Sequence, residues 1–159
     1  MHGGEGAAAV ELALVLPMLL ILLVGPLELG NFFLDQHVLV KGLRDGAVYA
    51  ARQDIQNYDC SSGAPTVPSA LVTDTKNIVR TGQLASGLDL LPNWSNGATT
   101  FTVTAACFTA SGIYSANNGK VPVVTVTASV PYKTVLSTLG FNATGFTLSG
   151  SQQSAVTGT

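Results

Sequence analysis

Charged side chains are scarce in this sequence. Only 10% of its 159 residues are Asp, Glu, Lys or Arg, only seven of these are basic, and the formal net charge is −2. A nucleic-acid surface needs a basic patch, because binding depends on releasing the counterions held by phosphates. We therefore expect no nucleic-acid partner.

Histidine is also nearly absent, since only His2 and His37 occur. A Ser–His or Cys–His pair for nucleophilic catalysis is therefore poorly supplied. Asp35 lies two positions before His37, and residues at that spacing on a helix point apart. With two cysteines added, the spacing still matches no zinc site. We expect a protein that is not an enzyme and that holds no metal and no cofactor.

The two cysteines, Cys60 and Cys107, allow two interpretations. Outside the cytoplasm such a pair most simply forms one disulfide, which would remove about 4 kcal/mol of unfolded-chain entropy. In a reducing compartment the same residues would be free thiols in the core. Which interpretation holds depends on whether the chain is exported.

Apolar residues, by contrast, are abundant, with 47% hydrophobic content and a mean hydropathy of +0.39. The excess lies in one run, and a helix of about 20 such residues crosses a bilayer. The sequence therefore predicts a short polar segment at residues 1–6, followed by a transmembrane helix at residues 7–34.

Four residues interrupt this run. Pro17 and Pro26 each remove a helix hydrogen bond, so we expect local bending. Glu11 and Glu28 lie near its two ends. An isolated acid inside a span costs about 3 kcal/mol, so it commonly has a partner or lies among the headgroups.

The helix is predicted to continue beyond the membrane over residues 35–54. Small residues recur there at spacing four, at Gly42, Gly46 and Ala50. Small residues at that spacing let another helix approach closely. They could pack against neighbouring subunits or against this chain's own sheet, and both interpretations stay open.

Residues 55–159 are predicted to form a small α+β domain. Ser69–Arg80 has the pattern of a short amphipathic helix, and Trp94 is the expected apolar anchor of the irregular stretch that follows. Thr134–Gly140 has room for one helical turn. The chain then changes from helical to alternating periodicity.

Alternating Val, Thr and Phe residues predict an antiparallel sheet of about three strands. The first two strands, Thr99–Thr109 and Val121–Val130, should form a hairpin with Asn118–Gly119 in its turn. Pro131 should end the second strand, and Phe146–Ser149 offers a third, followed by a polar tail. Ser and Thr, rather than charges, keep this part of the chain soluble.

Three stretches resemble a known family. GAAAVELALVLPMLLILLVGPLELG is similar to the start of TadE-like minor pseudopilins of tight-adherence (Tad, or Flp-type) pili. LVKGLRDGAVYAARQ resembles the family's juxtamembrane helix, and VVTVTASVPYKTVLSTLGFNATGFTLSGSQQSAV resembles its C-terminal part. In pilin-like proteins a prepilin peptidase cuts after a glycine, leaving a glutamate at the fifth mature position. The resemblance thus implies a leader at residues 1–6, cleavage between Gly6 and Ala7, and Glu11 as that glutamate.

The resemblance also implies a function and a location. It implies a minor pseudopilin subunit that takes part in assembling a tight-adherence pilus and is anchored in the bacterial inner membrane. Residues 55–159 would then be extracytoplasmic, and Cys60 and Cys107 would be paired. Glu11 would dock with the N-terminal amine of a neighbouring subunit. The implied partners are the membrane, the prepilin peptidase, other pilin or pseudopilin subunits and the pilus assembly platform.

Some positions depart from the family pattern. The leader carries Glu5 and no Lys or Arg, whereas Lys41, Arg44 and Arg52 follow the span. The positive-inside rule therefore favours the opposite orientation. We expect the N-terminus inside, because a disulfide and an uncharged polar domain both suit the outside.

An alternative function is a signal-anchored extracytoplasmic binding or adhesion domain that does not enter a pilus. It predicts that replacing Glu11 by alanine is harmless, whereas the pseudopilin interpretation predicts lost assembly.

Overall fold

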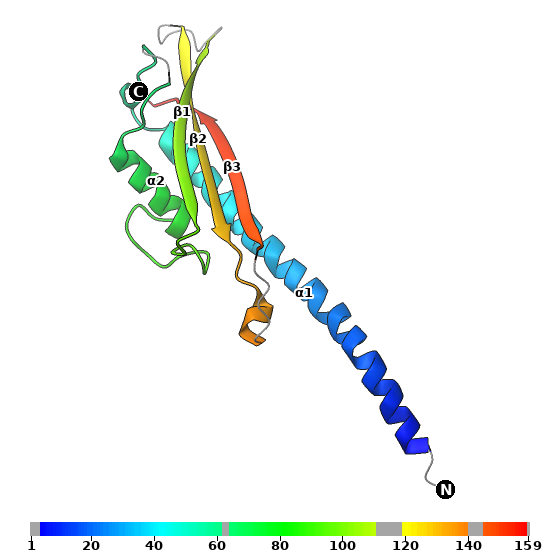
Figure 1. The fold of residues 1–159 in the computed structure, drawn as a ribbon. Coiled ribbons are helices and arrows are strands. Elements are labelled where there is room, and N and C mark those ends of the chain that lie inside the picture. The colour runs from blue at the N-terminus through cyan, green and yellow to red at the C-terminus, as the bar shows by residue number, and fades with distance from the viewer. Residues whose placement is uncertain (1–3, 62–63, 111–118, 140–144, 159) are drawn as a thin grey trace.

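The computed structural model describes residues 4–61, 64–110, 119–139 and 145–158. A long helix extends well beyond a domain in which two helices cover one face of a three-stranded antiparallel sheet (Figure 1). This arrangement confirms the predicted α+β class. The elements in chain order are α1 (Gly4–Ala51), η1 (Ile55–Asn57), α2 (Ser69–Thr81), β1 (Thr100–Thr109), β2 (Lys120–Pro131), η3 (Val135–Leu139) and β3 (Thr147–Ala155).

Helix α1 is continuous over its 48 residues. Both prolines lie inside it, and no break separates the predicted span from its predicted extension. The helix ends at Ala51, slightly before the expected residue 54. The side chain of Asp54 then accepts a hydrogen bond from the amide of Gln56 (2.9 Å), which caps the single turn η1.

The sheet has the order β1-β2-β3, with both neighbouring pairs antiparallel. The central strand buries alternate residues, as the period of two predicts. These are Pro122, Val124, Val126, Ala128 and Val130. The predicted hairpin of the first two strands is confirmed. Asn118 lies outside the described residues, while Gly119 has φ +71° and accepts the amide of Ala110 at 2.8 Å.

Strand β3 differs most from the prediction. It runs to Ala155 rather than ending at Ser149, so the expected polar tail is mostly strand. Its Ser, Gly and Gln residues carry no hydrophobic alternation, so the pattern that reveals strands was missing there. Antiparallel pairing with β2 holds these residues in a strand instead. The pairing runs from Thr147 opposite Pro131 to Ala155 opposite Val123. Pro131 is the last residue of β2, which confirms that this strand ends there.

The distal half of α1 forms the centre of the core. Leu39 and Leu43 are 1% and 0% exposed and share one cluster with Val124 and Leu148 of the sheet. Helix α1 approaches β3 closely at Gly150, where an added Cβ would lie 2.9 Å from the Leu43 side chain. The apolar residues after position 38 therefore bury a domain core, not a membrane surface.

Gly42 and Gly46 lie against α2 of the same chain. An added Cβ at Gly42 would be 2.8 Å from the carbonyl oxygen of Val79, and one at Gly46 would be 2.5 Å from the Val79 side chain. Ala50, one turn further on, is fully buried. The close helix contact was foreseeable from the spacing, but its partner is α2. Neither of the two interpretations left open named α2 as the partner, because the spacing of small residues does not specify which element fills this face.

This contact yields a test of the fold. Gly42→Ala should destabilise the domain by about 1–3 kcal/mol, because backbone of α2 must move away from the new methyl group. Gly30→Ala, in the same helix with nothing within 4 Å, is the matched control and should be neutral or slightly stabilising. Chemical denaturation of the detergent-solubilised chain measures both. Equal stability of the two variants would contradict the packing described.

Candidate functional site

The N-terminal half of α1 is an exposed apolar stem. We use that name for Ala8–Leu27, whose side chains are all exposed except Val24, which is half-buried. Leu14 and Ile21 are each 72% exposed. At about 1.5 Å per residue the stem spans about 30 Å, the thickness of a hydrocarbon core. Among the described residues this is the helix that is long and apolar enough to cross a membrane.

The predicted processing and docking residues lie at the start of this helix. Gly6 and Ala7 fall within the first turns of α1, and Glu11 follows one turn later. The Glu11 side chain is exposed, and no described residue donates a hydrogen bond to it or forms an ion pair with it. Among the residues that the structure describes, the Glu11 carboxylate is therefore available to a group from another molecule.

Glu28, at the other end of the stem, has partners within the chain. Its carboxylate oxygens accept hydrogen bonds from the amides of Val135 (3.0 and 3.1 Å) and Leu136 (3.3 Å). These amides begin the short helix η3, whose N–H groups have no partner inside the helix. Sequence reasoning assigned Glu28 no role. The available signals were an acid in an apolar run and a predicted turn near residue 134.

Tyr132 strengthens the same junction. Its hydroxyl accepts from the Asn31 side chain (2.9 Å) and donates to the Glu28 carbonyl (3.3 Å). Its ring lies edge-on to Phe32, with 5.2 Å between centroids. Burial raises the pKa of Tyr132. Burial also raises the pKa of Asp35, which lies on α1 one turn after Asn31. The base of the domain is thus attached to α1 where the stem ends.

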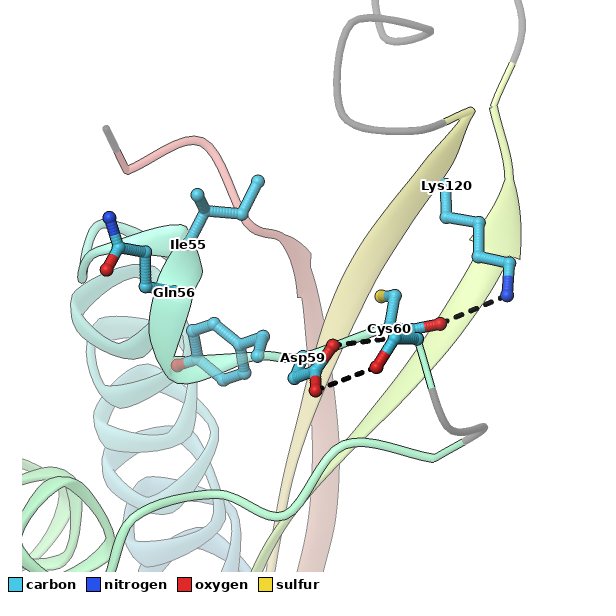
Figure 2. Close-up of a pocket in the computed structure, with 7 residues that line it drawn as sticks. Ile55, Gln56, Asp59, Cys60 and Lys120 are labelled. Carbon is cyan, nitrogen blue, oxygen red and sulfur yellow. Dashed lines mark hydrogen bonds between the residues drawn. The ribbon is translucent and has the colours of Figure 1, made fainter.

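The predicted disulfide between Cys60 and Cys107 is present. It joins the segment after η1 to strand β1, at the end of the domain far from the stem. In the close-up of Figure 2, Lys120 reaches toward this segment and donates to the carbonyl oxygen of Cys60 at 3.0 Å. These contacts hold a long irregular connection against the hairpin.

A hollow of about 440 Å³ lies beside the disulfide (Figure 2). Hydrogen bonds from the amide and hydroxyl of Ser61 lower the pKa of Asp59, which favours its ionised form. Burial raises the pKa of Tyr58 to about 12, and its hydroxyl donates to the Ala50 carbonyl at 2.7 Å. The sulfur of Cys60 is oxidised. The Ser61 hydroxyl donates to the Asp59 carboxylate at 2.9 Å, and no catalytic role is assigned to these lining residues.

A second hollow of about 540 Å³ lies between α2 and the start of β1. Arg80 borders it, forms an ion pair with Asp89 and also donates to Ser95 (3.3 Å). Trp94, only 3% exposed, packs near Phe101, which confirms it as the apolar anchor of its loop. Its indole Nε1 has no hydrogen-bond partner among the described residues. The ion pair and the indole ring together fix this loop.

The exposed stem, the exposed Glu11 and the helix that continues into the domain form one segment of sequence. Residues 6–48 match the family model described as TadE-like protein. The match begins at the predicted cleavage glycine and ends three residues before α1 does. It confirms the resemblance to the TadE-like family over this helix.

Comparison with curated proteins and with solved structures gave no match. The TadE-like match covers α1, so the likeness of the C-terminal stretch to that family stays a prediction from the sequence.

The predicted site residues do not gather in one place. Gly6, Ala7 and Glu11 lie on the stem, Gly42, Gly46 and Ala50 lie inside the domain, and the disulfide lies at the far end. Among the described residues no three His, Cys, Asp or Glu side chains come together as a metal site. The stem and its junction are therefore the candidate functional region.

The junction gives a second prediction. Glu28→Ala should remove the acceptor of two amides at the start of η3, and a hydrogen bond to a charged group contributes about 1.5–3 kcal/mol. We expect faster amide hydrogen exchange at Val135 and Leu136, with exchange in β2 unchanged. Gln36→Ala, which removes a bond to Ser149 (2.8 Å) instead, is the matched control. Unchanged exchange at η3 in Glu28→Ala would show that the carboxylate does not hold this turn.

Proposed function

We propose that this chain is a minor pseudopilin subunit that takes part in assembling a tight-adherence pilus. In this proposal a prepilin peptidase processes the chain and the stem anchors it in the bacterial inner membrane. One observation carries the proposal: within the TadE-like match, an exposed apolar stem bears a glutamate to which no described residue donates a hydrogen bond. The other subunits and the assembly platform are its partners, and no enzymatic role is assigned to it.

The chemistry of Glu11 supports a docking role. A carboxylate near the end of a span costs about 3 kcal/mol when isolated. Cleavage after Gly6 would create a free amine at Ala7, about 6 Å away along the axis of the same helix. Two parallel stems offset by about that length would bring one chain's amine to the other's carboxylate. Pairing the two charges offsets the desolvation cost of each.

The domain side supports an extracytoplasmic location. The Cys60–Cys107 disulfide is stable in an oxidising compartment. The open face of the sheet carries uncharged hydroxyl residues such as Thr102, Thr104 and Thr127, each exposed. Lys41 and Arg44 are exposed on the part of α1 that packs into the domain. They therefore belong to a folded unit rather than to a short loop, the setting for which the positive-inside rule is strongest.

The cleavage is tested by the N-terminal sequence of the membrane-extracted chain, with and without co-expressed prepilin peptidase. We expect a peptidase-dependent start at Ala7, because the small residues after Gly6 let a protease reach the backbone. An inactive peptidase is the control, and Gly6→Leu should block the cut. A start between residues 25 and 35 would mean removal of an ordinary signal peptide and would overturn the proposal.

The docking role is tested by pilus assembly in cells. Glu11→Ala and Glu11→Gln should abolish assembly while leaving the membrane-bound amount of the chain unchanged, because both remove the charge that pairs with the amine. Glu11→Asp keeps the charge and should retain part of the activity. Normal pili with Glu11→Ala would favour the alternative, an anchored binding or adhesion domain that does not enter a pilus.

A further inference from the structure

The base of the domain lies level with the end of the stem. In Figure 1, the turn η3 lies beside α1 at the end of the domain from which the stem emerges. The Glu28 carboxylate binds the first amides of η3, so this turn is fixed to the helix at residue 28. The amide of Tyr132 donates to the Phe146 carbonyl at 2.9 Å, which places residue 146 at the same base.

This base exposes apolar side chains. Phe146 is 59% exposed and Val135 is 49% exposed, beside the exposed Lys133. The bond from the Val135 amide to Glu28 places this base next to the end of the exposed stem, whose last residue, Leu27, is 66% exposed. An apolar patch with a cation at its edge, joined to a membrane-spanning helix, has the composition of a surface that enters the headgroup layer.

We propose that Lys133, Val135 and Phe146 form a membrane foot that rests in the headgroup layer of the bilayer that holds the stem. The partner that this surface contacts is therefore the lipid bilayer. This inference rests on the membrane anchoring in the proposed function, and it goes beyond it by fixing the depth of the chain.

The stem length supports this placement. Ala8–Leu27 spans about 30 Å, which fills the hydrocarbon core and leaves Glu28 at its edge. Asn31 and Phe32, one turn beyond, already contact Tyr132 and so cannot face lipid on that side. On the side of α1 that faces the domain, the membrane boundary would then lie near residue 28. On the opposite side the exposed Leu29, Phe33 and Leu34 continue the apolar surface to the end of the predicted span of 7–34.

Glu28 has a particular place in this arrangement. A carboxylate at the boundary would be costly without partners. The backbone amides of Val135 and Leu136 bind it and at the same time hold the foot at that level. The same contact thus sets where the stem ends and where the domain touches the lipid.

The experiment measures tryptophan depth in vesicles of the full chain. Phe146→Trp is compared with Phe108→Trp, which changes a residue of nearly equal exposure (57%) at the far end of the hairpin. The native Trp94 is the sole tryptophan and is buried, so it gives a constant background. Each variant is reconstituted in phosphatidylcholine and in phosphatidylcholine brominated at carbons 6 and 7. Leu20→Trp, in the middle of the stem, reports insertion.

We expect the added emission of Phe146→Trp to fall by about twofold or more in brominated lipid, since interfacial side chains reach about 5–10 Å into the headgroup and acyl boundary. Phe108→Trp should match the background. Quenching of Leu20→Trp without quenching of Phe146→Trp would overturn the foot and leave the anchor intact. No quenching of Leu20→Trp would overturn the membrane anchor in the proposed function, and the foot with it.

Discussion

The organisation of this protein depends on one helix that meets two different environments. The apolar side chains of α1 as far as Leu27 are exposed, whereas Leu39 and Leu43 are buried in the domain core. A continuous backbone joins the two halves, so their relative position cannot change without bending the helix. The contacts at Glu28 mark the transition, because there the chain's own amides replace water around a charged group.

Glycines let the elements of this small domain pack closely around α1, which forms the centre of its core. Gly42 and Gly46 admit α2, and Gly150 admits the helix against β3. Each of these contacts removes apolar surface from water with few large side chains. The disulfide then closes the far end, where polar loops provide little hydrophobic stabilisation. The result is a rigid head on an exposed apolar stem.

Several elements could be predicted from the sequence because a local pattern specified them. Alternating Val and Thr revealed β1 and β2, since one face of that sheet is buried and the other is open. The predicted third strand is too short. The Ser and Gln residues of β3 follow no hydrophobic period, and pairing with β2 holds them in the strand. The role of Glu28 was missed for a related reason: its partners lie 107 and 108 residues away along the chain.

The sequence by itself determined the apolar stem, its glutamate and the α+β class, whereas it left open whether the two cysteines pair. These features depend on composition, periodicity or neighbouring residues. The tertiary structure decided which element covers Gly42 and Gly46, how far β3 extends and what satisfies Glu28. Those outcomes depend on which segments far apart in the sequence come into contact. No local pattern specifies these contacts, because many different sequences can pack closely or form the same backbone hydrogen bonds.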